Sequence, residues 1–252
     1  AGLIAVGEED EGAGAEATIL VADFGGGTSD FSVVEAGPTS GARVLAQSGV
    51  ALAGDAFDAR MIDAVVAPAL GKGTKYQVEF GHEAPVPSWI YNRLRRWHHL
   101  SMLKSADTVT LLERIADGAR DKDGIARLVR IVEEDLGLPL HGAVEHAKLA
   151  LTAAPTADFD FRRPGIAIAA PVARAAFDAW IEPELDAIDG AIDEALAAAG
   201  VTSVDRVFAT GGSSLVPAVR ARLAARFGAD RLVGGEELTS VAAGLAAMAA
   251  RQ

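Results

Sequence analysis

The sequence predicts an α/β protein in which a mixed β-sheet is interrupted by a mainly helical insertion. Three observations predict this class. Near the start, short β-branched segments are separated by tight turns. Toward the end, short apolar segments alternate with segments of helical spacing. Between them, residues 71–165 show no such succession of strands and read as irregular and helical segments. Antiparallel strands followed by strands that alternate with helices give a sheet of mixed direction with helices packed on it.

The composition narrows the class of protein further. Half of the 252 residues are apolar, which is enough for a packed core and too many for a solvated coil. Cysteine is absent, which excludes a disulfide framework, a thiolate metal site and a cysteine nucleophile. The 35 acidic and 23 basic residues give a formal net charge of -12, which argues against nucleic acid or an anionic membrane as partner.

The sequence has few features of a membrane-spanning or targeting segment. No apolar run reaches the roughly 20 residues of a membrane span, and the first residues lack a basic segment followed by an apolar one. We therefore expect a cytoplasmic protein. The start, Ala1-Gly2-Leu3, resembles the interior of a longer chain.

The first third of the chain is expected to form a three-stranded meander and a helix. Residues 18–22 are a short apolar run with β-branched bias, and residues 29–35 alternate between apolar and polar side chains. A glycine-rich turn joins these two strands. Residues 43–50 form the third strand, and apolar residues near helical spacing predict a helix over residues 53–69.

The rest of the chain divides into the insertion and a return to the sheet. Residues 71–92 look irregular, and residues 93–152 predict three or four helices. We expect the core domain to comprise 1–70 and 166–252, with 71–165 as the helical insertion. Its second part predicts a strand over 165–170, a helix from Pro171 that bends at Pro183 and ends at Gly200, a strand over 204–209, a helix from Pro217, a strand over 231–233 and a final helix over 238–248.

The strongest motif is Asp23-Phe24-Gly25-Gly26-Gly27-Thr28-Ser29-Asp30, between the first two strands. Three glycines at a turn let backbone amides approach a ligand, and successive amides of this kind bind anions such as phosphate. Two carboxylates beside a phosphate require a cation, which predicts Mg²⁺. One carboxylate could also orient or deprotonate an attacking water. The alternative is an ordinary glycine-rich hairpin loop with two solvated aspartates.

A second motif lies between the strand over 204–209 and the following helix. It reads Thr210-Gly211-Gly212-Ser213-Ser214, and its glycines would let a ligand lie against the backbone at a helix N-terminus. Taken alone, it is explained equally by a Gly-Gly turn with a serine N-cap.

The two motifs in this order resemble the ATPase domain of the DnaK-type heat-shock chaperones, in the actin-like ATPase superfamily. The first resembles that family's second phosphate loop and the second its adenosine motif. Residues 51–61 (ALAGDAFDARM) resemble the family's segment after the third strand, and Glu145-His146-Ala147-Lys148 resembles its Glu-x-x-Lys helix. The insertion, with Pro85-Val86-Pro87-Ser88-Trp89, is similar to the YegD-like branch of that family.

The resemblance implies a ribonuclease H-like α/β fold and a nucleotide site, of which this chain carries only the second lobe. The partners it implies are ATP or ADP with Mg²⁺, the missing first lobe, and client or co-chaperone proteins. It places Gly25, Gly26, Gly27 and Thr28 on the phosphates. It assigns the catalytic role to Asp23, Thr28 and Asp30. It also implies that Asp23 and Asp30 bind Mg²⁺ through water molecules. Its adenosine site comprises Gly54, Glu145, Lys148, Thr152, Gly211, Gly212 and Ser213.

The chain departs from the family at two adenine contacts. Leu149 and Leu215 stand where the family has the arginines that sandwich the base, and Ala53-Gly54 replaces a Gly-Gly pair. Leucine keeps apolar contact but loses the cation–π component, about 0.5–2 kcal/mol per contact.

The resemblance leads to one leading hypothesis and two alternatives. The leading one is the ATP- and Mg²⁺-binding half of a chaperone-like ATPase, inactive as this chain alone. The alternatives are a nucleotide-binding regulatory or pseudo-ATPase scaffold, and another actin-like protein such as a sugar kinase or a filament protein.

Other chemistry-bearing residues suit structural roles. Adjacent helical residues such as His98 and His99 point about 100° apart, which is unsuited to a shared ligand. We interpret the group of Arg93, Arg95 and Arg96 as a helix face or an interdomain contact.

Overall fold

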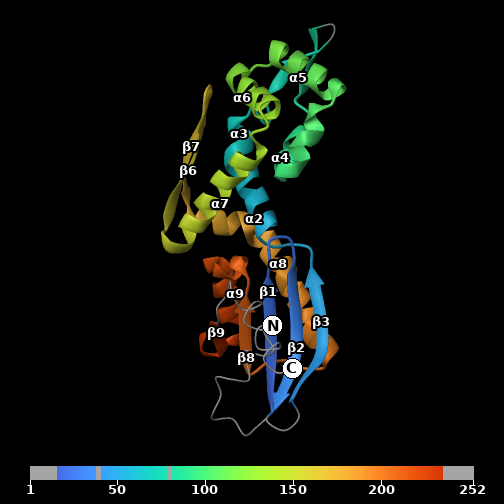
Figure 1. Ribbon diagram of the computed structural model, residues 1–252, viewed down its shortest axis with the longest axis vertical. Coiled ribbons are helices and arrows are strands. Elements are labelled where there is room, and N and C mark those ends of the chain that lie inside the picture. Colours follow the sequence, from blue (N-terminus) through green and yellow to red (C-terminus); the bar gives the residue numbers. More distant parts are fainter. Residues whose placement is uncertain (1–15, 38–40, 79–80, 235–252) are drawn as a thin grey trace, which may run out of the picture. The chain divides into compact units, whose positions relative to one another are not determined.

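The computed structural model describes residues 16–37, 41–78 and 81–234. Of these, the residues up to Ala56 and from Glu182 onward form one compact unit, here called the sheet unit (Figure 1). Phe57–Ile181 form a second, the helical unit. This division assigns more of the chain to the helical part than the 71–165 expected from the sequence. The predicted final helix lies outside the described residues.

The sheet unit contains a five-stranded mixed sheet in the order β3-β2-β1-β8-β9. The first three strands are antiparallel neighbours, and β8 and β9 run parallel to β1. This confirms an α/β architecture with the predicted three-stranded meander. The strands are β1 (Ala17–Phe24), β2 (Ser29–Gly37), β3 (Gly41–Val50), β8 (Arg206–Thr210) and β9 (Leu232–Gly234).

The centre of the sheet is apolar because β1 is flanked by strands on both sides. Leu20, Ala22 and Phe24 of β1 are fully buried. Phe24 meets Phe31 of β2 edge to face, with ring centroids 5.7 Å apart. This arrangement stabilises the pair beyond the burial of its apolar area. This packing fixes the end of β1, where the glycine-rich connection begins.

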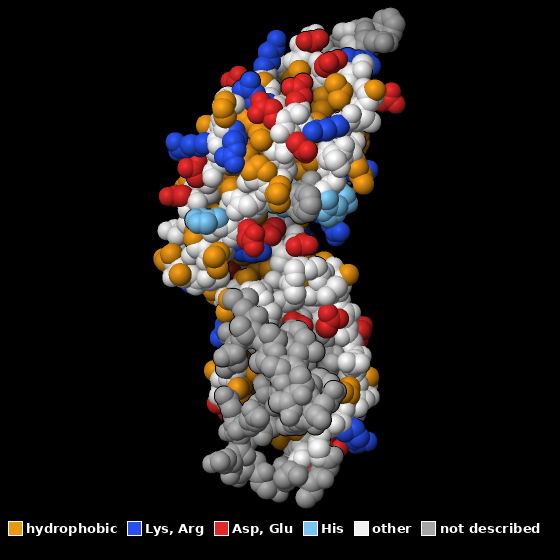
Figure 2. Space-filling view, viewed as in Figure 1, with side chains coloured by type: hydrophobic (Ala, Val, Ile, Leu, Met, Phe, Trp, Pro, Cys, Tyr) orange, Lys and Arg blue, Asp and Glu red, His pale blue; other side chains and the backbone are white. Residues whose placement is uncertain are grey.

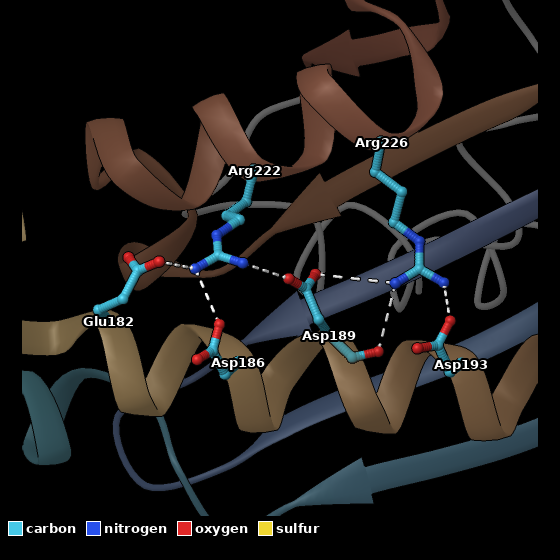
Figure 3. Close-up of polar contacts among 6 residues, drawn as sticks. All are labelled: Glu182, Asp186, Asp189, Asp193, Arg222 and Arg226. Atoms are coloured by element: carbon cyan, nitrogen blue, oxygen red, sulfur yellow. Dashed lines mark hydrogen bonds and ion pairs between the residues drawn. The ribbon is translucent and has the colours of Figure 1, made fainter.

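Two helices of the sheet unit are joined by a ladder of ion pairs (Figure 3). Acidic residues of α8 (Arg174–Ala199) face two arginines of α9 (Pro217–Phe227). Arg222 contacts Glu182, Asp186 at 3.0 Å and Asp189 at 2.8 Å. Asp189 also faces Arg226 at 3.8 Å, and Arg226 pairs with Asp193. Three carboxylates that otherwise repel one another along α8 therefore share the guanidinium of Arg222.

Replacing Arg222 by alanine is expected to destabilise the sheet unit by about 1 kcal/mol. The loss exceeds that of a single surface pair, because the carboxylates of Glu182 and Asp186 lose their partner together. Urea unfolding followed by far-UV circular dichroism measures it. The effect should shrink in about 1 M salt, where screening acts over roughly 3 Å. Arg43→Ala, which removes one exposed pair with Glu35, is the control, and an equal loss there contradicts the ladder's role.

The helical unit is built from short helices and two small hairpins. Side chains cap two of its helices: Ser105 accepts from Thr108 N at 3.4 Å, and Asp121 accepts from Gly124 N at 2.8 Å. Its elements are α2 (Gly54–Met61, which begins in the sheet unit), η1 (Ile62–Val66), α3 (Ala67–Ala69), β4 (Lys75–Gln77), β5 (Glu83–Pro85), α4 (Ser88–Leu94), η3 (Trp97–Lys104), α5 (Ala106–Gly118), α6 (Lys122–Glu133), α7 (Gly137–Ala153), β6 (Thr156–Arg163) and β7 (Ile166–Ala173).

The strand expected at 165–170 does not belong to the mixed sheet. It is β7, which pairs only with β6 in a separate two-stranded hairpin. The expectation that Pro171 opens a helix is also wrong, because Pro171 lies in β7 opposite Asp158, and α8 begins at Arg174. Likewise β6 falls in a stretch expected to be part of the helical insertion. Its alternation of buried Phe159 and Phe161 with exposed neighbours was the missed evidence.

The irregular segment expected over 71–92 is more ordered than predicted. It holds the antiparallel pair β4–β5 and the start of α4. The buried Tyr91 of α4 donates its hydroxyl proton to the Leu70 carbonyl at 3.1 Å, which ties α4 to the end of α3. Tyr76 and Tyr91 therefore belong to the core of the helical unit, whereas Trp89 of the same segment is exposed.

Within residues 16–37, 41–78 and 81–234, no helix has the length and apolarity needed to cross a bilayer. On the face drawn in Figure 2, basic, acidic and hydrophobic side chains are interspersed over the helical unit.

Candidate functional site

The glycine-rich connection brings two predicted site residues directly together. β1 ends at Phe24 and β2 begins at Ser29, so four residues join the strands. In the antiparallel register Asp23 lies opposite Asp30, which places both carboxylates on the same face of the sheet. The Thr28 hydroxyl donates to Asp30 Oδ2 at 2.9 Å and orients that carboxylate. The sequence therefore identified a real cluster of Asp23, Thr28 and Asp30.

The loop is fastened to two other segments through its carbonyl groups. The Gly25 carbonyl accepts from Ser213 Oγ at 2.8 Å and from Gly54 N at 3.4 Å. The Gly26 carbonyl accepts from Asp55 N at 2.7 Å. The glycine-rich loop, the segment at the start of α2 and the Gly-Gly-Ser motif thus meet at one place. Gly54 and Ser213, predicted for the adenosine site, lie within hydrogen-bond distance of the loop.

The amides of the loop are left available where its carbonyls are engaged. Gly26, Gly27 and Thr28 are exposed, and among the described residues none of their N–H groups donates a hydrogen bond. Exposed amides in succession are the donors with which a loop binds an anion. The arrangement therefore presents three donors beside two carboxylates.

Neither backbone conformation nor packing explains the glycines at positions 26 and 27. Neither has a positive φ. A Cβ at Gly26 would lie 3.5 Å from Asp55 Oδ1, and one at Gly27 would lie 3.9 Å from Asp55 Oδ2, both ordinary contacts. The fold tolerates a methyl group at both positions, so the absence of side chains suits close approach of a ligand from outside.

Gly211 differs, because the fold itself demands it. Its φ is +85°, and a Cβ there would overlap the Phe24 carbonyl and lie 2.9 Å from Asp23 Oδ1. Asp23 pairs in parallel register with Thr210, so β8 ends against the end of β1. Gly211 thus lets the second motif pack on the first. Its neighbour Gly212 starts the 3-10 turn η4 (Gly212–Leu215) and is exposed.

Asp55 is a site residue that the sequence reasoning did not select. Its amide holds the Gly26 carbonyl, and its exposed carboxylate lies over Gly26 and Gly27. The motif over residues 51–61 contained Asp55, but a single aspartate after a strand has no spacing that marks it. Only the chain reversal through residues 51–54 brings this third carboxylate to the loop.

The electrostatics of the loop favour binding of a cation. Partial burial and the neighbouring Asp30 raise the pKa of the Asp23 carboxyl above its ordinary value of 3.8. The described residues contain no group of three or more histidine, aspartate or glutamate side chains that converge as direct metal ligands. Two carboxylates at a loop of free amides suit a hard cation that keeps most of its water, as Mg²⁺ does.

The remaining predicted residues lie on α7 in the helical unit. Lys148 forms an ion pair with Asp58 of α2 at 2.8 Å, and both side chains are largely buried. The Thr152 hydroxyl donates to the Leu149 carbonyl at 2.7 Å, and Glu145 is exposed. Two of these three polar side chains are therefore already engaged by the protein.

Arg174 holds the end of α7, a role that the sequence did not reveal. Its guanidinium donates to the carbonyls of Leu151 at 2.7 Å, Ala154 at 2.8 Å and Thr152 at 3.3 Å. These are carbonyls that a helix end leaves without intrahelical partners. The α7 end that carries Thr152 is thereby held by the start of α8.

The two leucines that replace family arginines differ in exposure. The Leu149 side chain is 60% exposed, which is unusual for leucine, whereas Leu215 is partly buried. Leu149 lies one helical turn after Glu145 and shares its helix face. It leaves an apolar, uncharged surface where the resemblance expects a cation.

A separate hollow of about 480 Å³ lies within the helical unit, between α5, α6 and the β6–β7 turn. Arg130 crosses it and donates to the Pro164 carbonyl at 2.8 Å, a reach that the glycine at position 165 permits. The lining carries both charges and does not include any predicted site residue. Its residues are Ala116, Asp123, Ala126, Arg127, Val129, Arg130, Glu133 and Gly165.

No family model matches the chain.

Proposed function

We propose that the chain is the ATP- and Mg²⁺-binding half of a chaperone-like ATPase of the DnaK type, in its YegD-like branch. Under this proposal the five-stranded sheet is the core of a ribonuclease H-like lobe, and the residues around Asp23 form its phosphate loop. A first lobe would complete the site, and client or co-chaperone proteins would be the partners of the whole. This chain alone is expected to bind nucleotide weakly and not to hydrolyse it.

One observation carries the proposal: the glycines at 26 and 27 are required neither by backbone conformation nor by packing. These glycines and Thr28 are exposed residues whose amides donate to no described residue, while the adjacent carbonyls are engaged. This is the geometry expected of a loop shaped for an anionic ligand. The facing carboxylates of Asp23 and Asp30 supply the cation side of the same site.

The chain's own residues have distinct roles in this scheme. The loop amides bind phosphate oxygens, and the Thr28 hydroxyl keeps Asp30 oriented. The raised pKa of Asp23 suits a carboxylate that accepts a proton from an attacking water. When bound, hydrated Mg²⁺ supplies the positive charge that offsets the carboxylates and the phosphate.

A nucleotide-binding scaffold without catalysis is the second candidate, and the helical unit favours it specifically. The Lys148 ammonium is paired with Asp58, and the Thr152 hydroxyl is bonded within its own helix. With Leu149 in place of an arginine, the adenosine side offers few free polar groups. A sugar kinase or filament protein of the actin-like class has no comparable support.

Substitution of both Gly26 and Gly27 by alanine tests the proposal. Titration of the ¹⁵N-labelled chain with Mg·ATP should shift the amide resonances of residues 25–28, and the double variant should lose these shifts. Its free energy of unfolding should change by less than about 1 kcal/mol, because both methyl groups fit. Amide shifts detect millimolar binding, which suits the weak affinity expected.

Gly142→Ala provides the matched control. It adds a methyl group in α7 where no atom lies within 4 Å. It should retain the loop shifts of the unaltered chain. If Mg·ATP leaves residues 25–28 unshifted, or the double alanine variant responds like the unaltered chain, the proposal is contradicted. Shifts with Mg·ATP and none with Mg·adenosine would assign the contact to the phosphates.

A further inference from the structure

The helical unit carries a basic surface that the proposed nucleotide site does not use. No aspartate or glutamate occurs between Glu83 and Asp107, although the whole chain has a net charge of -12. This acid-free segment contains four lysine or arginine residues and forms α4 and η3. The solubility of an acidic protein does not require such a local concentration of positive charge.

Two of the four cations are neutralised and two are not. Arg95 pairs with Asp63 at 2.7 Å, and Lys104 pairs with Asp135 at 3.4 Å. Among the described residues, Arg93 and Arg96 have no carboxylate partner. Arg93 instead contacts the Met102 thioether, with its Nη1 2.5 Å from the sulfur, a weak acceptor that leaves the charge uncompensated.

Exposed apolar side chains lie directly beside these arginines. Trp89 is 40% exposed and precedes Arg93 by one helical turn on α4, which places the two on the same face. Met102 is 53% exposed and touches Arg93 from η3. We call Trp89, Arg93, Arg96 and Met102 the basic–apolar patch. Tryptophan, methionine and arginine are the residue types enriched in protein interfaces.

His99 lies next to the patch in the chain and feels the charge of its arginines. The pKa of His99 is lowered, by desolvation first and then by the charges of His98, Arg93 and Arg96. Both arginines therefore act on His99, and neither forms an ion pair with a carboxylate in the part of the chain that the structure describes. Their charge is available to an acidic group from outside.

We propose that the basic–apolar patch docks a short acidic segment of a partner protein, one in which carboxylates alternate with aliphatic or aromatic side chains. Carboxylates would pair with Arg93 and Arg96, and the apolar side chains would cover Trp89 and Met102. The small size of the patch favours a short peptide over nucleic acid, because two unpaired cations can neutralise few phosphates. This inference does not depend on nucleotide binding.

Fluorescence anisotropy with a labelled synthetic peptide tests the proposal on the whole chain. The probe is a twelve-residue peptide of glutamate alternating with leucine and phenylalanine, compared with the same peptide carrying glutamine in place of glutamate. The acidic peptide should bind in dilute salt and weaken as salt rises, and the glutamine peptide should bind at least about tenfold more weakly. The double substitution Arg93→Glu and Arg96→Glu should weaken acidic-peptide binding at least about tenfold.

Two control variants distinguish binding at the patch from a general effect of net charge and from loss of folding. Arg43→Glu with Arg162→Glu makes the same charge change at residues 72% and 70% exposed elsewhere, and should leave binding within about twofold. Met102→Ser keeps every charge and should weaken binding about threefold. The proposal is overturned by no binding in dilute salt, by equal losses in the two double variants, or by tighter binding of a dodecathymidylate than of the acidic peptide.

Discussion

Alanine at position 211 is expected to destabilise the sheet unit by about 3 kcal/mol or more. The residue has a φ of +85°, where a Cβ is strained, and the new methyl group would overlap the Phe24 carbonyl. Relief would require β8 to move away from the end of β1, with which it is paired through Asp23 and Thr210. The loop carbonyl held by Ser213 would lose its partner in the same movement.

The placement of the aromatic residues allows the two units to be followed separately. All three tryptophans and both tyrosines lie within residues 57–181, so intrinsic fluorescence reports on the helical unit. Urea unfolding of Gly211→Ala should show an earlier transition by far-UV circular dichroism. Hydrogen exchange should accelerate at the amides of β1 and β8, because these strands report the sheet unit directly.

Gly190→Ala is the matched control for Gly211→Ala. It adds the same methyl group within α8, where no atom lies within 4 Å, and it should stabilise by about 0.5–1 kcal/mol. A Gly211→Ala variant as stable as the unaltered chain would show that β8 accommodates a side chain at the junction, contrary to the geometry described.

Asparagine in place of Asp23 is expected to remove the Mg²⁺ dependence of nucleotide binding and yet leave the protein at least as stable at neutral pH. The carboxylate of Asp23 is partly buried and faces Asp30, and both effects raise its pKa in the folded state. The folded chain therefore binds this proton more tightly than the unfolded chain. Stability falls as pH rises from 3.8 through the raised pKa, and stays reduced above it.

The pH dependence of unfolding measures this effect. The difference in unfolding free energy between Asp23→Asn and the unaltered chain should be largest near pH 7 and should vanish below the ordinary pKa of 3.8. Asp158→Asn removes the same charge at an exposed position in β6 and is the matched control. A variant that is less stable at pH 7 would mean that Asp23 is held by favourable partners and not by repulsion.

The facing of Asp23 and Asp30 could be predicted from the sequence because its information is local. Asp23 and Asp30 are symmetrically placed about a four-residue turn, so any antiparallel pairing that closes the turn brings them opposite each other. Glu145, Lys148 and Thr152 share a helix face for a similarly local reason, the 3.6-residue period. The pairing of Lys148 with Asp58 could not be predicted, because 90 residues separate them in the chain.

For the strand predicted at 165–170, local sequence information failed to indicate which sheet the strand joins. Residues 166–173 have the buried alternation of a strand, but alternation does not state which sheet a strand joins. Its partner was decided by the tight turn at Pro164 and Gly165, with a φ of +72° at the glycine, which pairs β7 with the strand just before it. The Pro-Gly pair in the sequence is typical of such a tight turn and favours this hairpin.

By itself, the sequence determined the α/β class, the meander and the loop whose ends carry facing carboxylates, because hydrophobic period and turn chemistry act over a few residues. Tertiary structure alone decided that Gly211 packs on Phe24 and that Asp55 lies over the loop. It also decided that Arg93 and Arg96 pair with no carboxylate among residues 16–37, 41–78 and 81–234. Such features arise where distant segments compete for the same space and the same partners. That competition also decided which glycines the fold needs and which remain available for a ligand.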